Sequence, residues 1–154
     1  MSKLRYAAIE ITGDPVAKGR GRAVNTSRGA RVVTPEKTRK WEADARAEAR
    51  RQMDQAAPFD QPLSVSIDVT FAPPKSWPNW KREAALAGHI PHTGKPDVDN
   101  VVKAAMDALN GIVYLDDAQV YWIKAHKIWG TRPSVRVRVA EAPTVSSQKE
   151  YKLL

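Results

Sequence analysis

Residues 64–71 read Ser-Val-Ser-Ile-Asp-Val-Thr-Phe and alternate between polar and apolar side chains. Because successive side chains of a strand point to opposite faces, Val65, Ile67, Val69 and Phe71 are expected on the buried face of a β-sheet. This is the clearest strand signal in the chain, and the rest of the predicted fold is built around it. Further strands are expected at residues 4–12, 120–129 and 134–140, with a short apolar one at 112–115.

Two longer segments have helical periodicity. One helix is expected to run to Met53. Thr34 can cap its start, and Pro35 suits its first helical position. A second helix is expected over residues 99–109, capped by Asp99 and ended by Asn110-Gly111. A short helix is also expected at residues 79–87. The sequence therefore predicts an α+β fold, a single compact domain in which a mixed β-sheet packs with helices.

Composition limits the class of protein. The chain has 154 residues, the size of one compact domain, and its 42% hydrophobic residues are typical of globular proteins. It contains no Cys, which excludes disulfides and thiolate metal sites. No apolar stretch approaches the length of a membrane span, and residues 1–12 lack the layout of a secretory signal, so we expect no membrane partner and a cytoplasmic location.

The positive charge is concentrated in one segment. The formal net charge of the chain is +8, and residues 18–40 hold eight basic residues against one acid. The first half of this segment is interrupted by glycines and has neither helical nor strand periodicity, so residues 18–33 are predicted to form a flexible basic arm. An arm of this kind favours a polyanionic partner, with nucleic acid first. The alternative is a solvated loop without a partner.

Acidic residues are concentrated in the run Lys95-Pro-Asp-Val-Asp-Asn100. In an extended Asp-x-Asp the two side chains point the same way, so Asp97 and Asp99 can face one spot before the helix. Asp116 or Asp117, beyond the next turn, could supply a third carboxylate. Capping and turn chemistry are the alternative explanation for these acids.

A cluster of carboxylates needs a compensating cation, because like charges held together raise one another's pKa. Oxygen ligands alone suit a hard ion such as Mg²⁺. Lys103 lies four residues after Asp99, where its ammonium can either stabilise charge on a phosphate or form an ion pair with that acid. A phosphodiester substrate would explain both the acidic cluster and the basic arm.

The run from Lys95 to Gly111, Lys-Pro-Asp-Val-Asp-Asn-Val-Val-Lys-Ala-Ala-Met-Asp-Ala-Leu-Asn-Gly, followed by Leu-Asp-Asp-Ala-Gln-Val at 115–120, resembles the RusA family of Holliday-junction resolvases of bacteria and their prophages. The resemblance implies a homodimeric, Mg²⁺-dependent endonuclease, with Mn²⁺ as a substitute, that nicks opposing strands of a four-way DNA junction. It assigns the catalytic and metal-binding carboxylates to Asp97, Asp99 and Asp117, the essential lysine to Lys103, and a supporting role to Asp116. Residues expected to contact DNA are Lys18, Arg20, Arg22 and Lys95.

The sequence departs from a minimal member of this family in two places. Residues 72–88 form a Pro- and Trp-containing insert, and residues 141–154 form an additional tail. Before the first Asp, Lys95 alone replaces a run of arginines. Two other functions remain open on the sequence: a non-catalytic basic DNA-binding module, and a metal-dependent nuclease for other branched or flap substrates. A third is an interaction protein that docks on an acidic partner.

Overall fold

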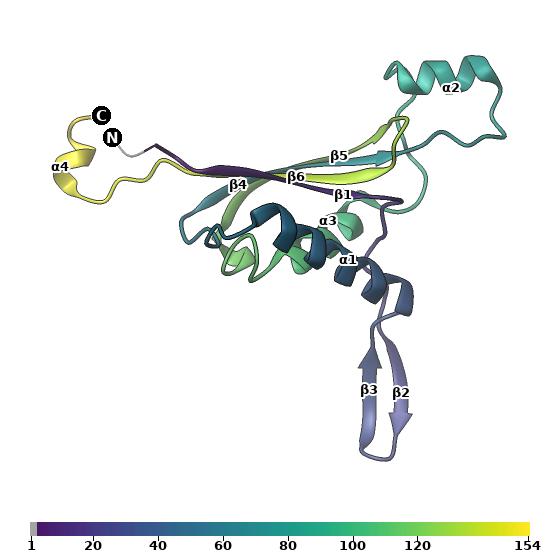
Figure 1. The fold of residues 1–154 in the computed structure, drawn as a ribbon, viewed down its shortest axis with the longest axis horizontal. Helices are drawn as coiled ribbons and strands as arrows, with labels where there is room; N and C mark the ends of the chain where they lie inside the picture. The colour runs from purple at the N-terminus through teal and green to yellow at the C-terminus, as the bar shows by residue number, and fades with distance from the viewer. Residues whose placement is uncertain (1–2) are drawn as a thin grey trace.

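The strand β4 (Leu63–Phe71) lies inside a four-stranded sheet in a computed structural model that describes residues 3–154 (Figure 1). It pairs antiparallel with β6 (Ser134–Glu141) and parallel with β5 (Val120–Trp129). β1 (Tyr6–Thr12) pairs antiparallel with β6, which gives the order β1-β6-β4-β5. The predicted mixed sheet of an α+β domain is therefore confirmed.

Two helices, α1 (Glu36–Met53) and α3 (Val98–Leu109), cover one face of this sheet (Figure 1). Val65, Ile67 and Val69 of β4 are fully buried, as their alternation predicts. The two helices contact one another, and alanines are frequent on the buried face of each. The buried stripe of α1 contains Trp41, Ala45, Ala49 and Met53, and that of α3 contains Val101, Ala104, Ala105, Met106, Ala108 and Leu109.

Both helix starts differ from the prediction. Pro35 stands at the N-cap of α1 and Asp97 at that of α3, and neither cap has a side-chain hydrogen bond. The N-cap of α1 is therefore one residue after the predicted Thr34, and that of α3 is two residues before the predicted Asp99. Helix ends can shift by one or two residues in this way, because neighbouring residues can also serve as the start. The predicted strand at 112–115 is also wrong, since these residues form a turn with isolated bridges at Tyr114.

The basic segment contains a β-hairpin rather than the predicted loop. β2 (Arg22–Thr26) pairs antiparallel with β3 (Gly29–Val33), and every residue of both strands is exposed. Gly29 has a φ of 106°, a conformation that favours glycine, at the end of the turn. The hairpin projects away from the sheet and from both helices (Figure 1). Because neither of its faces is buried, its sequence lacks the apolar alternation from which strands are predicted.

The remaining elements are short. α2 (Asn79–Leu86) confirms the predicted short helix, and it lies beyond the end of the sheet (Figure 1). A 3₁₀ turn, η1 (Asp117–Gln119), precedes β5, and α4 (Gln148–Tyr151) lies within the predicted tail. None of the helices within residues 3–154 has the length and apolar composition needed to cross a bilayer. Residues 1 and 2, which belong to the segment expected not to be a secretory signal, lie outside the described residues.

Candidate active site

The helix α3 presents a charged face beside its buried one. Asp99, Lys103 and Asp107 follow one another at intervals of four residues and therefore share this face. Asp99 and Lys103 are exposed, whereas Asp107 is half-buried. The opposite face packs in the core, so the helix cannot rotate these three side chains inward. The core thus fixes the direction of the charged row.

The turn η1 places two further acids near the end of this row. Asp116 caps the turn: its Oδ1 accepts a hydrogen bond from the Ala118 amide at 3.0 Å, and its own amide donates to Gln119 Oε1 at 2.9 Å. Gln119 Nε2 in turn donates to the carbonyl oxygens of Phe59 and Gln61. Asp116 therefore holds the turn in place and leaves Asp117 exposed beside it.

The two neighbouring carboxyl groups differ in acidity. The hydrogen bond from the Ala118 amide lowers the pKa of Asp116. The pKa of Asp117 is raised, chiefly by a side-chain hydrogen bond with Asp116 and further by burial and by the charges of Asp116 and Asp107, while Lys103 opposes the rise. Asp117 thus lies within the electrostatic reach of the charged row of α3, and this place favours a proton or a cation.

Asp97 lies at the other end of α3. Its Oδ1 forms an ion pair with Lys95 Nζ at 2.8 Å, and this contact lowers the pKa of Asp97. Both side chains are exposed, so neither is shielded from a ligand. The preceding loop is held by Lys127, whose Nζ donates to the carbonyl oxygens of Gly94 at 2.6 Å and Pro96 at 3.0 Å. The position of Asp97 therefore depends on β5 as well as on α3.

The predicted site residues lie on α3 and on the turn that follows it. Asp97 and Asp99 stand at the start of α3, and the charges of Lys103 and Asp107 on the same helix act on Asp117 of η1. Within residues 3–154, no three His, Asp or Glu side chains form a group that could hold a metal ion. The assignment of Asp97, Asp99, Asp116 and Asp117 as metal ligands remains a prediction.

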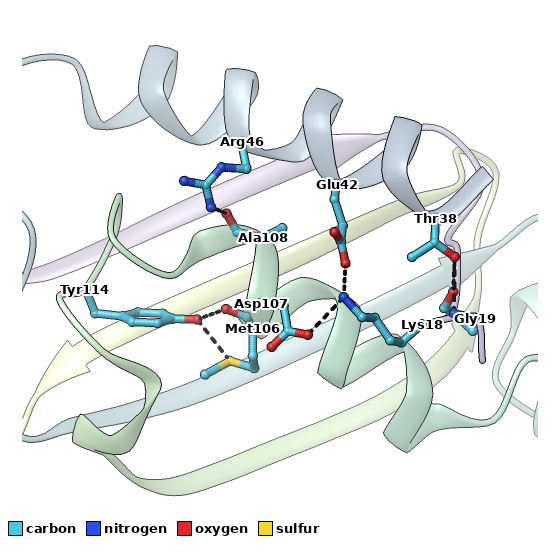
Figure 2. A network of polar contacts seen from close by, with 10 residues as sticks. Lys18, Gly19, Thr38, Glu42, Arg46, Met106, Asp107, Ala108 and Tyr114 are labelled. Atoms are coloured by element: carbon cyan, nitrogen blue, oxygen red, sulfur yellow. Dashed lines mark hydrogen bonds and ion pairs between the residues drawn. The ribbon is translucent and has the colours of Figure 1, made fainter. Parts of the chain in front are cut away.

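Lys18 was expected to contact DNA, but its ammonium is already engaged (Figure 2). Its Nζ lies 2.6 Å from Glu42 Oε1 of α1 and 3.2 Å from Asp107 Oδ2 of α3. Its amide donates to the Asn100 carbonyl at 2.9 Å. These contacts raise the pKa of Lys18, with the Glu42 hydrogen bond as the largest cause. Lys18 thus fastens the start of the basic segment to both helices.

The carboxyl end of α3 is fixed by two further groups in the same network (Figure 2). The hydroxyl of buried Tyr114 donates to the Met106 carbonyl, and Arg46 Nη1 donates to the carbonyls of Ala108 at 3.0 Å and Asn110 at 3.2 Å. Burial, aided by the neighbouring acids, raises the pKa of Tyr114. Sequence reasoning missed these contacts, because nothing in the helical spacing of Arg46 indicates which helix end it reaches.

Comparison with known proteins agrees with this architecture. Residues 12–140 match the family described as Endodeoxyribonuclease RusA. The uncharacterized protein YqaN of Bacillus subtilis (strain 168) is 34% identical over 133 residues, which cover 85% of this chain and 93% of YqaN. The crossover junction endodeoxyribonuclease rusA of Lactococcus phage r1t is 28% identical over 88 residues, or 54% of this chain and 59% of the phage protein. The matched residues include α1, α3, η1, β4, β5 and all but the last residue of β6, and the chain belongs to the RusA family of endodeoxyribonucleases.

Proposed function

We propose that this protein resolves four-way DNA junctions by a divalent-metal-dependent pair of nicks in opposing strands. The observation that supports this best is that, on a RusA fold, Asp117 of η1 lies within electrostatic range of Lys103 and Asp107 of α3. A phosphodiester there would meet both acids and a lysine. The exposed arginines Arg20 and Arg22 lie in the segment that leads away from the same helix.

The donor set fits a hard divalent cation. The side chains involved offer only carboxylate oxygens, which such an ion prefers as ligands, and Asp116 and the charge of Asp107 both raise the pKa of Asp117. Mg²⁺, with Mn²⁺ as a substitute, would be held by Asp97, Asp99 and Asp117, with Asp116 in support. When bound, such an ion lowers the pKa of water and offsets negative charge on a phosphate.

The remaining roles belong to groups of this chain. Lys103 is exposed on the charged face of α3, where its ammonium can position the scissile phosphate and stabilise the charge that grows on it during attack by water. Lys95, paired with Asp97, can exchange that partner for a DNA phosphate because both groups are solvent-accessible. Asp116 has a structural role in addition, as the cap of η1.

Two nicks at symmetric positions require two equivalent sites. A four-way junction has approximate two-fold symmetry, so a two-fold homodimer would present one site to each of two opposing strands. We therefore propose that the active form is a homodimer. Size-exclusion chromatography with light scattering on the purified protein would show a mass near twice that of the chain.

Mapping the nicks on all four strands of a labelled immobile junction tests reaction, substrate and symmetry together. With Mg²⁺ we expect paired nicks, and with excess chelator we expect binding without cleavage. Binding without cleavage in Mg²⁺ would instead identify a non-catalytic DNA-binding module. Equal or faster cleavage of matched flap or three-way substrates would identify a nuclease of different selectivity.

A further inference from the structure

The two faces of the β2–β3 hairpin differ in charge. In an antiparallel pair, residues directly opposite each other lie on the same face. Arg22 is opposite Val33 and Val24 is opposite Arg31, so both arginines share one face with the two valines. The other face consists of Ala23, Asn25, Ala30 and Val32. The hairpin is thus a thin ribbon with one arginine face.

The arginine face is turned toward the start of α1. A hollow of ≈ 370 Å³ between the hairpin and this helix is lined by Arg22, Val24 and Val33 from the hairpin and by Arg39 from α1. Thr34, Pro35 and Glu36 complete its lining. Glu36 is the sole acid in this lining, against two arginines from two different elements. The lining of the hollow therefore has a net positive charge, and the hollow is large enough for a phosphate group of a polyanion.

The hairpin has little to stabilise it within the chain. Val32 is 79% exposed, and β2 and β3 have their extensive contacts with each other alone among the described elements. A two-stranded hairpin without further packing is marginally stable in water. No acid occurs between residues 15 and 35, so the hairpin also lacks internal charge compensation. An anionic surface that accepts a two-stranded ribbon would supply both the missing packing contacts and the missing negative charge.

The base of the hairpin is fixed relative to the candidate active site. The Gly19 amide donates to Thr38 Oγ1 at 3.1 Å on α1, and Lys18 contacts both α1 and Asp107 of α3 (Figure 2). A Cβ at Gly19 would lie 2.6 Å from Pro35 Cγ, so the chain passes close to the helix start here. A ligand held by the hairpin would consequently lie in a defined position relative to the acids of α3.

We infer that the β2–β3 hairpin is a duplex-binding arm, which enters the major groove of one double-stranded arm of the substrate with Arg22, Arg31 and Arg39 on the flanking phosphates. This inference rests on the proposed action on DNA. B-form DNA has a major groove about 12 Å wide that admits a two-stranded β-ribbon. The groove and its phosphates supply both the apolar contact and the negative charge that the hairpin lacks. Arg28, in the turn between the strands, would lie deepest along the groove.

Binding to a linear duplex in chelator tests this arm separately from cleavage. Fluorescence anisotropy with a labelled duplex compares wild type with the double variant Arg22→Gln/Arg31→Gln. Each phosphate contact contributes about 0.9 to the slope of log affinity against log salt, so we expect the slope to fall by about 2 and affinity at 0.1 M salt to fall on the order of 50-fold. Arg22→Lys/Arg31→Lys keeps both charges and should retain most of the affinity.

A matched control removes charge elsewhere. Arg50 is exposed on α1 outside the hairpin and the hollow, so Arg50→Gln should leave duplex binding unchanged. Circular dichroism and thermal unfolding of the double variant should match wild type, since the hairpin contributes little to the core. Equal duplex affinity of wild type and the Gln double variant would overturn the inference.

Chemical footprinting identifies the groove. Bound protein should protect guanine N7, in the major groove, from dimethyl sulfate, and methyl green should displace the protein whereas the minor-groove ligand netropsin should not. Protection of adenine N3 alone would contradict major-groove entry. A protein that binds duplex through the hairpin but never nicks a junction in Mg²⁺ would refute the proposed function and leave this inference standing. A protein that nicks junctions while the Gln double variant binds duplex normally would refute the inference alone.

Discussion

Lys18 shows how one side chain can serve both the fold and the site. Its ammonium bridges Glu42 of α1 and Asp107 of α3, and all three side chains are partly buried, with 21–34% of each exposed. Lys18→Met keeps much of the aliphatic stem but leaves two acids without their cation. We expect the free energy of unfolding in urea to fall by about 1 kcal/mol, as for partly exposed ion pairs. A double-mutant cycle with Glu42→Gln should show coupling, and strict additivity would contradict the bridge.

The same contacts predict a pH dependence. Glu42 and Asp107 raise the pKa of Lys18 above its ordinary value of 10.5. The folded state therefore binds the Lys18 proton more tightly than the unfolded state, so the stabilisation is complete below the ordinary pKa and is lost as pH rises through the raised one. The stability difference between wild type and Lys18→Met should persist at about pH 8 and shrink at strongly alkaline pH. A difference that grows with alkalinity would show that the bridge is not its cause.

Asp116 and Asp117 are neighbours with separable roles. Asp117→Asn should reduce nicking of a junction by on the order of a thousandfold, because it removes a proposed metal ligand. Junction binding in chelator should stay intact or improve, because the variant also removes a negative charge that repels phosphate. Asp116→Asn keeps a side-chain oxygen that can accept the Ala118 hydrogen bond, so η1 should survive and nicking should fall less. Single-turnover cleavage and gel shift measure the two effects. Wild-type cleavage by Asp117→Asn would remove that residue from the site.

Among the elements, those with a buried face could be predicted and those without one could not. The alternation of residues 64–71 predicts β4 correctly because Val65, Ile67 and Val69 pack under the helices. The strand β5 was also predicted with its observed bounds, Val120–Trp129. The hairpin has no buried face to impose a period, and residues 112–115 are apolar because Val113 and Tyr114 pack into the core from a turn.

The residue types of the candidate site could be predicted from the sequence, but the contacts between them could not. The spacing of Asp97, Asp99 and Lys103 indicates a charged helix start, and α3 confirms the helix. Spacing along one helix does not reveal which distant side chain meets it. Lys18 therefore meets both Glu42 and Asp107 through tertiary packing of α1 on α3, for which the sequence has no local signal.

The loop before α3 is held by a neighbouring strand, which gives it a testable role in the site. Lys127 of β5 donates to the Gly94 and Pro96 carbonyls, directly before Asp97. Lys127→Met should release this loop and lower single-turnover nicking by about tenfold to a hundredfold through misplacement of Asp97. Junction affinity in chelator should change much less, because the acid itself remains.

Lys124 provides a matched control on the same strand. It is exposed on β5, so Lys124→Met removes an equal charge without releasing the loop. We expect nearly wild-type nicking from this variant. If Lys124→Met and Lys127→Met reduce nicking equally, the effect of Lys127 is its charge alone and the loop has no positioning role.

At the scale of the whole molecule, the basic hairpin segment and the acidic face of α3 are separate but are connected through Lys18. The chain has a net charge of +8, and the hairpin segment without acids is fastened through Lys18 to the helix that bears the acids. Repulsion between phosphates and an exposed acid such as Asp117 would weaken binding unless cations lay close by. On the proposed function, the basic arm would supply the attraction and the acids would be left for a bound cation. Binding without a divalent ion should therefore depend on the hairpin and show a steep dependence on salt.

A homodimer with one site per subunit predicts the products of a mixed dimer. A supercoiled plasmid that extrudes a cruciform becomes linear when opposing strands are cut within one binding event, and becomes a nicked circle when only one strand is cut. Co-expression of wild type with Asp117→Asn under two different tags allows the mixed dimer to be purified. We expect wild type to give linear plasmid, the mixed dimer to give nicked circles at about half the strand-cleavage rate, and the Asp117→Asn dimer to give neither. Linear product from the mixed dimer at the wild-type rate would show that one subunit makes both cuts, and the two-fold arrangement of active sites would have to be abandoned.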